Sequence, residues 1–272
     1  MPVISHKRLN CPPESVTLWR YMNLSKFKNL LETSQLYFSR LDNFEDPHEG
    51  VFPAKNFEPT SLTKVHQVDV ILGFDEKTGK YTLGSNNYVK HIPLAEYHKN
   101  DFDKVVKESK ERNLLLSKQI FASCWHKNST ESAQFWQLYR YDEPMIAIRT
   151  SVFDLVAAVT DRAYMYISDV QYYNEGDPIP SDNNFFAAIY KRKQFESEKE
   201  VRLLFWSEEP VNKNRADGVC FKAHVDLRKL VNEVWISPYY PERYYFEVKS
   251  IIDKLKWEVK LKNSTVLKKP NA

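Results

Sequence analysis

Short apolar runs and helical apolar spacings follow one another along the chain in an irregular order. Strands are predicted where apolar and aromatic residues alternate or run together, at 16–21, 36–39, 120–125, 145–149, 164–173, 201–206, 219–225, 234–236 and 257–261. Phe27, Leu30 and Leu31 recur at helical spacing after Ser25, a residue type that caps helices. Further helices are predicted from 101 to about 116, around 135–139, at 152–159 with Ser151 as its cap, at 185–193, in one or two turns capped by Asp226, and from 241 to about 255.

This order of elements predicts a single α+β domain covering residues 1–272. Strands and helices do not alternate with regular βαβ spacing, so we expect a mixed or mainly antiparallel sheet flanked by helices, with a split sheet as a variant. Only 6 glycines occur, and no segment has the composition of a flexible linker. Residues 52–93 lose the periodicity, with a hairpin turn expected at 77–80. We interpret this segment as an insertion or lid.

Composition and charge set few limits on partners. The chain has 39 basic and 36 acidic residues, a net charge of +3, so no nucleic-acid or membrane partner is required by charge. Cys11, Cys124 and Cys220 lie too far apart for a disulfide framework or a zinc motif, which predicts free thiols in a reducing compartment. No stretch approaches the roughly 18 apolar residues of a membrane span. We therefore expect a cytoplasmic protein with no membrane partner.

Several distinct blocks of aromatic and polar residues are distributed over most of the chain. They include Trp19-Arg20-Tyr21, 36–39, Asn43-Phe44-Glu45-Asp46-Pro47-His48-Glu49, the segment 121–139, the segment 190–204 and Val234-Trp235-Ile236-Ser237-Pro238. Together they resemble the bacterial family called domain of unknown function 2971. The likeness spans most of the chain outside residues 52 to about 115. It carries no activity with it.

A second pattern concerns the order of three polar residue types. An arginine (Arg20), a serine on a central strand (Ser123) and the pair Glu198 and Glu200 before an apolar strand follow one another along the chain. This order is similar to the arginine-serine-glutamate class of ADP-ribosyltransferases, which usually has an aliphatic residue where Arg202 stands. The resemblance implies a transferase-like fold, NAD as the substrate, and a transferase or NAD glycohydrolase activity in a phage-defence or toxin setting. The acceptor it implies is a protein, a nucleic acid, a small molecule or water.

The chemistry of this class explains why such residues are needed. Cleavage of the nicotinamide–ribose bond develops positive charge on the ribose, which a carboxylate stabilises most in the transition state. Glu200 would take that role, and Glu198, two residues away on the same strand, would face the same cleft. Arg20 would hold a pyrophosphate or ribose group, and Ser123 would brace Glu200 or the nicotinamide ribose. The expected cofactor-binding residues are Arg20, Tyr21, Asn43, Asp46, Trp125, Trp136 and Tyr139.

Two other functions fit the same residues. A metal-dependent nuclease would gather Asp46, Glu49, Glu198 and Glu200 around magnesium. A non-catalytic module would bind nucleotides or nucleic acid through aromatic strands and the basic runs at 191–193 and 260–269. The transferase hypothesis needs no metal, and the histidines do not fall at metal-ligand spacing: His48, His66, His91, His98 and His224.

Structural roles remain open for each candidate residue. Glu198 and Glu200 fit the solvent face of an edge strand, Ser123 fits a satisfied core hydroxyl, and Arg20 fits an ion pair with Asp46 or Glu49. Cys124 and His126 lie two apart on one predicted strand. They would face the same side, as a cysteine–histidine nucleophile pair requires.

Overall fold

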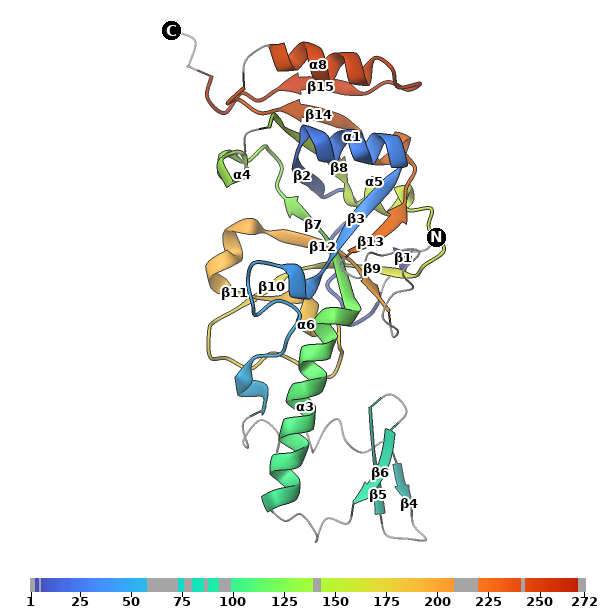
Figure 1. The fold of residues 1–272 in the computed structure, drawn as a ribbon, viewed down its shortest axis with the longest axis vertical. Helices are drawn as coiled ribbons and strands as arrows, with labels where there is room; N and C mark the ends of the chain where they lie inside the picture. Colours follow the sequence, from blue (N-terminus) through green and yellow to red (C-terminus); the bar gives the residue numbers. More distant parts are fainter. Residues whose placement is uncertain are drawn as a thin grey trace. The chain divides into compact units, whose positions relative to one another are not determined.

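The computed structural model divides the chain into two compact units (Figure 1). It describes residues 3–4, 6–57, 73–75, 80–85, 88–92, 99–138, 143–207, 220–240 and 243–268. Unit 1 comprises Met1–Arg40, Phe121–Val170 and Phe195–Ala272, and unit 2 comprises Leu41–Ile120 and Gln171–Gln194. The chain passes between the units at four points, and none of these has the composition of a linker.

Unit 1 is built on one large sheet of mostly antiparallel strands. The central order is β1-β9-β12-β7-β2-β8-β14-β15, and β3 pairs with both β7 and β13. The strands are β1 (Val3–Ile4), β2 (Thr17–Asn23), β3 (Gln35–Arg40), β7 (Ile120–Lys127), β8 (Met145–Ser151), β9 (Met165–Asp169), β12 (Glu200–Trp206), β13 (Cys220–His224), β14 (Glu233–Ile236) and β15 (Lys260–Asn263). With its flanking helices, this sheet confirms the predicted mixed α+β class.

Polar residues at helix starts fix where the helices of unit 1 begin. Helix α1 (Leu24–Thr33) is capped by Asn23, whose Oδ1 accepts the Lys26 amide proton at 2.9 Å, so the cap predicted at Ser25 is wrong by two residues. Helix α5 (Val152–Ala158) is capped by Ser151, as predicted, because its Oγ accepts the Asp154 amide proton. The remaining helices of this unit are α4 (Ala133–Leu138), α7 (Leu227–Leu230) and α8 (Arg243–Ile252).

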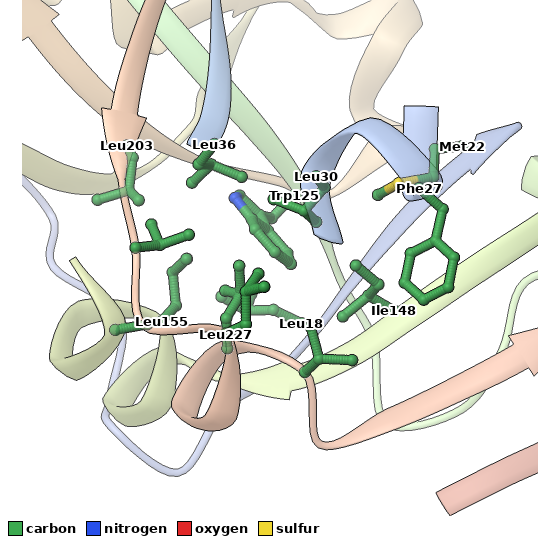
Figure 2. Packing of buried hydrophobic residues seen from close by; sticks show 14 of the residues in the cluster. Leu18, Met22, Phe27, Leu30, Leu36, Trp125, Ile148, Leu155, Leu203 and Leu227 are labelled. Carbon is green, nitrogen blue, oxygen red and sulfur yellow. The ribbon is translucent and has the colours of Figure 1, made fainter. Parts of the chain in front are cut away.

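The main hydrophobic core of unit 1 covers one face of the sheet. Side chains from β2, β7, β8 and β12 meet those of α1, α5 and α7 in a single buried cluster. Figure 2 shows Trp125 among the aliphatic side chains of this cluster, with Leu30 and Leu36 nearby. At about 25 cal/mol per Å² of buried apolar surface, such a cluster is the main stabilising contribution to the unit.

Unit 2 combines one long helix with short elements. It contains α3 (Lys99–Gln119), α6 (Phe186–Ile189), β10 (Gln171–Tyr173), β11 (Tyr190–Arg192) and the short 3-10 helices η1 (Leu41–Asn43) and η2 (Ala54–Phe57). A separate antiparallel sheet contains β4 (Gly73–Asp75), β5 (Lys80–Ser85) and β6 (Tyr88–Ile92). These three strands lie in the predicted insertion at 52–93. The turn residues 77–79 of the expected hairpin lie outside the described residues.

Two predicted elements are divided in the structure. The strand expected at 164–173 is two strands, because Val170 separates β9 in the large sheet from β10, which pairs with β11. The helix expected at 185–193 ends at Ile189, and residues 190–192 continue as β11. In both cases strand pairing with a distant segment overrides the local pattern.

No described helix combines the length and the low polarity that a membrane span requires. The longest, α3, carries charged residues along its whole length.

Candidate functional site

The three strands that carry the predicted transferase residues are neighbours in the order β12-β7-β2. Successive side chains on a strand point to opposite faces of the sheet. One face, here the Leu203 face, carries the main-core side chains Leu18, Met22, Phe121, Trp125, Val201 and Leu203. The other, here the Glu200 face, carries Trp19 and Tyr21 from the smaller aromatic cluster and, by alternation, Cys124, His126, Glu200 and Arg202.

Arg20 and Ser123 lie in direct contact on the Leu203 face. The Arg20 Nη1 donates a hydrogen bond to the Ser123 Oγ, and its Nη2 donates to the Tyr37 carbonyl at 3.0 Å. The contact occurs where β7 changes partner: its last residues pair with β2 at Leu18 and Trp19, and its first residues pair with β3. Arg20, on β2, therefore connects β7 and β3 at the point where β7 changes partner.

Trp125 lies beneath the Arg20 guanidinium. The guanidinium carbon is 5.4 Å from the centre of the indole ring, within cation–π range. The ring is buried in the main core, and its Nε1 has no hydrogen-bond partner among the described residues. Its surroundings favour a packing role over a stacking platform for a ligand.

Glu200 is held by a fully buried arginine. Arg202 Nε and Nη2 both donate to Glu200 Oε2, at 2.9 and 2.5 Å. Glu200 is 9% exposed and Arg202 is 0% exposed. Because a buried guanidinium stays charged, the Glu200 carboxylate serves as a counter-ion to it. Arg202, the departure from the transferase pattern, therefore orients the candidate catalytic glutamate.

Glu198 does not share a strand with Glu200. It ends the 3-10 helix η4 (Lys193–Glu198), and β12 begins only at Glu200. Between them Lys199 has a left-handed backbone with φ of 42°. The prediction that both carboxylates face one cleft from the same strand is therefore wrong, because the chain turns between them.

His126 lies on the Glu200 face with one ring nitrogen anchored. Its Nδ1 is 2.7 Å from the Glu198 carbonyl oxygen, and its ring packs on Phe135 with centroids 4.3 Å apart. Burial lowers the pKa of His126; the contact with the Glu198 carbonyl and the Glu200 charge act in the opposite direction, while Lys199 adds to the lowering. From the sequence, His126 was predicted only as a partner of Cys124. The alternation along its strand could be predicted, but the pairing of strands that brings it near Glu200 could not.

Two predicted aromatic residues also lie on the Glu200 face. Tyr21 is buried, its hydroxyl accepts the Ser132 amide proton at 2.7 Å, and burial raises the pKa of this phenol. Trp136 is fully buried, and its Nε1 donates to Glu131 at 2.8 Å. These bonds give both residues structural roles beside the candidate site.

The carboxylate loop at 42–49 belongs to unit 2. Asp46 pairs with Arg192 at 2.8 Å, and Glu49 pairs with Lys191 at 3.2 Å, with both carboxylates largely buried. Asn43 ends η1 and is exposed. Both carboxylates are therefore engaged in ion pairs within unit 2. No cluster of metal-binding side chains occurs in the part of the chain that the structure describes.

The structure thus groups the predicted residues in three places. Arg20, Ser123 and Trp125 meet on the Leu203 face, while Glu200, Tyr21 and Trp136 lie on the opposite face. Asn43 and Asp46 belong to unit 2, and Tyr139 falls outside the described residues. The single cleft expected for Arg20, Ser123 and Glu200 is not what these three strands form.

Comparison with protein-family models and with curated protein sequences gives no match. Both family resemblances therefore stay predictions.

Proposed function

We propose that the protein cleaves the nicotinamide–ribose bond of NAD, as an ADP-ribosyltransferase-like enzyme or an NAD glycohydrolase, with Glu200 as the catalytic carboxylate. The observation that carries this proposal is the fixed Glu200 carboxylate, held at 2.5 and 2.9 Å by the fully buried Arg202. A carboxylate preorganised in this way stabilises a developing cation without reorganising during the reaction.

The bond that breaks defines what Glu200 contributes. As the electron pair leaves with the nicotinamide nitrogen, positive charge appears on the ribose C1′ and ring oxygen. One Glu200 oxygen is engaged by Arg202, and the second faces this charge in the proposed complex. Because the charge exists mainly in the transition state, the interaction raises the rate more than the affinity.

Arg20 and Ser123 have a different role in this proposal from the one the resemblance implies. Their mutual hydrogen bond and the bond to the Tyr37 carbonyl lie on the face opposite Glu200. We assign them to bracing β7 where it changes partner. This keeps the three strands in register and so keeps Glu200 in place.

The setting of the activity follows from the resemblance and from the thiols. None of the three cysteines, all of which the structure describes, is in a disulfide, which suits a reducing bacterial cytoplasm. A role in phage defence or in a toxin system belongs to the same proposal. NAD is the substrate, and no metal ion enters the reaction.

The test is NAD turnover by the purified protein and two matched variants. Glu200→Gln keeps the shape and a hydrogen-bond acceptor for Arg202 but removes the charge, and we expect turnover to fall by about 10²-fold or more. Glu198→Gln makes the same chemical change two residues away and should leave turnover within about twofold of wild type. Circular dichroism and thermal unfolding check that each variant is folded at the assay temperature.

Two outcomes would contradict the proposal. If wild type neither consumes NAD nor shows an NAD-induced rise in Tm, the activity is absent and a binding module becomes the better hypothesis. If Glu200→Gln and Glu198→Gln lose turnover equally, the carboxylate that matters is not the one fixed by Arg202. For a binding module, substitutions in the basic run at 260–269 would instead abolish nucleotide binding.

A further inference from the structure

The two ring nitrogens of His126 differ in their contacts: Nδ1 is hydrogen-bonded, and Nε2 has no partner among the described residues. A carbonyl oxygen only accepts hydrogen bonds, so the 2.7 Å contact with Glu198 requires the proton of the neutral imidazole on Nδ1. The Nε2 atom then carries a lone pair. It is buried, in a residue only 5% exposed, and has no hydrogen-bond partner among the described residues. A buried acceptor of this kind normally has a donor, from a ligand or an internal water.

The surroundings of His126 keep it neutral. The charged groups near it are Lys199 and Glu200, at the join of η4 and β12. From β2 it faces the neutral phenol of Tyr21, with ring centroids 6.5 Å apart. Helix α4, which packs on it through Phe135, has no titratable side chain. Lys199 disfavours the imidazolium and Glu200 favours it, so burial decides, and Nε2 is available as an acceptor near neutral pH.

We propose that His126 Nε2 accepts the proton of the nucleophile, and that this nucleophile is a water molecule held inside the protein. This role for His126 rests on the proposed function, and it favours the NAD glycohydrolase over the ADP-ribosyltransferase. Nε2 has almost no solvent contact, and a water molecule is the smallest acceptor that can reach such a buried atom once NAD is bound beside it. The enzyme is then an NAD glycohydrolase, and free ADP-ribose is its product.

The step balances without a further reactant. The C1′–nitrogen bond breaks, its electron pair stays on nicotinamide, and nicotinamide leaves as a neutral molecule. The water oxygen forms the new bond to C1′, and its proton moves to His126 Nε2. Glu200 faces the ribose cation during this exchange. The imidazolium then releases its proton to solvent, so that NAD and water give ADP-ribose, nicotinamide and one proton.

A conservative substitution separates this role from a structural one. In His126→Asn the amide nitrogen takes the place of Nδ1 and keeps the bond to the Glu198 carbonyl, but the Nε2 acceptor is lost. We expect a folded protein with turnover about 10²-fold below wild type. The wild-type kcat/KM should fall on the acid side as His126 becomes protonated, and this acid limb should disappear in the variant. Wild-type turnover in His126→Asn, or an unchanged acid limb, would overturn the proposal.

Product stoichiometry tests the water acceptor. With NAD labelled in the adenosine half, wild type should release ADP-ribose and nicotinamide in equal amounts, and adding cell protein or nucleic acid should not divert the label. Nicotinamide in excess, with label on the added macromolecule, would show transfer and overturn the internal-water inference.

An NMR measurement stands apart from activity. In ¹⁵N-labelled protein near neutral pH, His126 should show a protonated Nδ1 and an unprotonated Nε2, and its ring proton Hε1 should show a cross-peak to bound water. An Nε2–H tautomer would reject the inference even if NAD is consumed. If the expected tautomer and water are seen but NAD is not consumed, the proposed function fails, and with it the assignment of the water as nucleophile.

Discussion

The two faces of strands β2, β7 and β12 differ in how their polar groups are used. On the Leu203 face, Arg20 and Ser123 bond to each other within a large apolar cluster. On the Glu200 face, a carboxylate is held by a buried arginine, and the Nε2 of a neighbouring imidazole has no hydrogen-bond partner in the part of the chain that the structure describes. Adjacent residues of the same strands therefore serve stability on one side and, in our proposal, chemistry on the other. The order of residue types in a motif does not say which side each one takes.

The largest effect on stability is expected from Arg202→Met. This change removes the guanidinium that holds Glu200, and breaking such a buried pair destabilises a protein by about 3–5 kcal/mol. The double variant Arg202→Met with Glu200→Leu removes both charges and should regain most of the loss. Urea unfolding of the three proteins measures the difference. A loss below about 1 kcal/mol for the single variant would show that Glu200 does not depend on this pair.

A smaller effect is expected on the other face from Ser123→Ala. The Arg20 Nη1 then loses its acceptor in a partly buried place, which costs about 1–3 kcal/mol, while NAD turnover stays near wild type. Ser39→Ala, the same chemical change on the neighbouring strand β3, should alter stability by less than about 0.5 kcal/mol. If Ser123→Ala abolishes turnover in a folded protein, the two faces are not separate in function.

The pH dependence of stability probes His126 directly. Its pKa in the folded protein lies below the ordinary value of about 6.5, which the unfolded chain keeps. As the pH falls below that value, the unfolded state takes up a proton that the folded state does not. The free energy of unfolding should therefore be fully present above about pH 6.5 and decline from there down to the folded pKa. Urea unfolding across this window should show the decline in wild type, and a similar slope in His126→Asn would contradict it.

The smallest effect is expected from Glu198→Gln. The contact that this residue makes with His126 comes from its main-chain carbonyl, which the substitution keeps. We expect stability within about 0.5 kcal/mol of wild type and an unchanged His126 tautomer. A shift in the His126 ring ¹⁵N signals would show that the Glu198 side chain, and not only its carbonyl, sets the imidazole.

Much of the local structure was predictable, and two of the errors share one cause. The strands around residues 120, 145, 201 and 234 were found because their apolar runs are short and sharply bounded. The caps at Ser151 and Asp226 were found because a side-chain acceptor lies next to the amides it serves. The continuous strand at 164–173 and the helix at 185–193 were wrong because residues 171–173 and 190–192 pair with each other. Such pairing is invisible to a local window.

The division into two units was hidden from the sequence for a related reason. Unit 2 is assembled from two segments, Leu41–Ile120 and Gln171–Gln194, that are interrupted by part of unit 1. A linker appears in composition only when a chain finishes one unit before starting the next. Here the chain enters unit 2 twice and returns to unit 1 each time, so no change in composition marks the boundary.

The sequence by itself determined the α+β class, the residue types available for chemistry and the alternation that assigns neighbouring residues to opposite faces. Only the tertiary structure decided that Arg20 meets Ser123, that Arg202 holds Glu200, and that His126 lies on the Glu200 face with one nitrogen that has no partner among the described residues. The physical reason is that propensity and periodicity act over a few residues. Strand order and burial, by contrast, arise from contacts between segments as far apart as residues 20, 123 and 200.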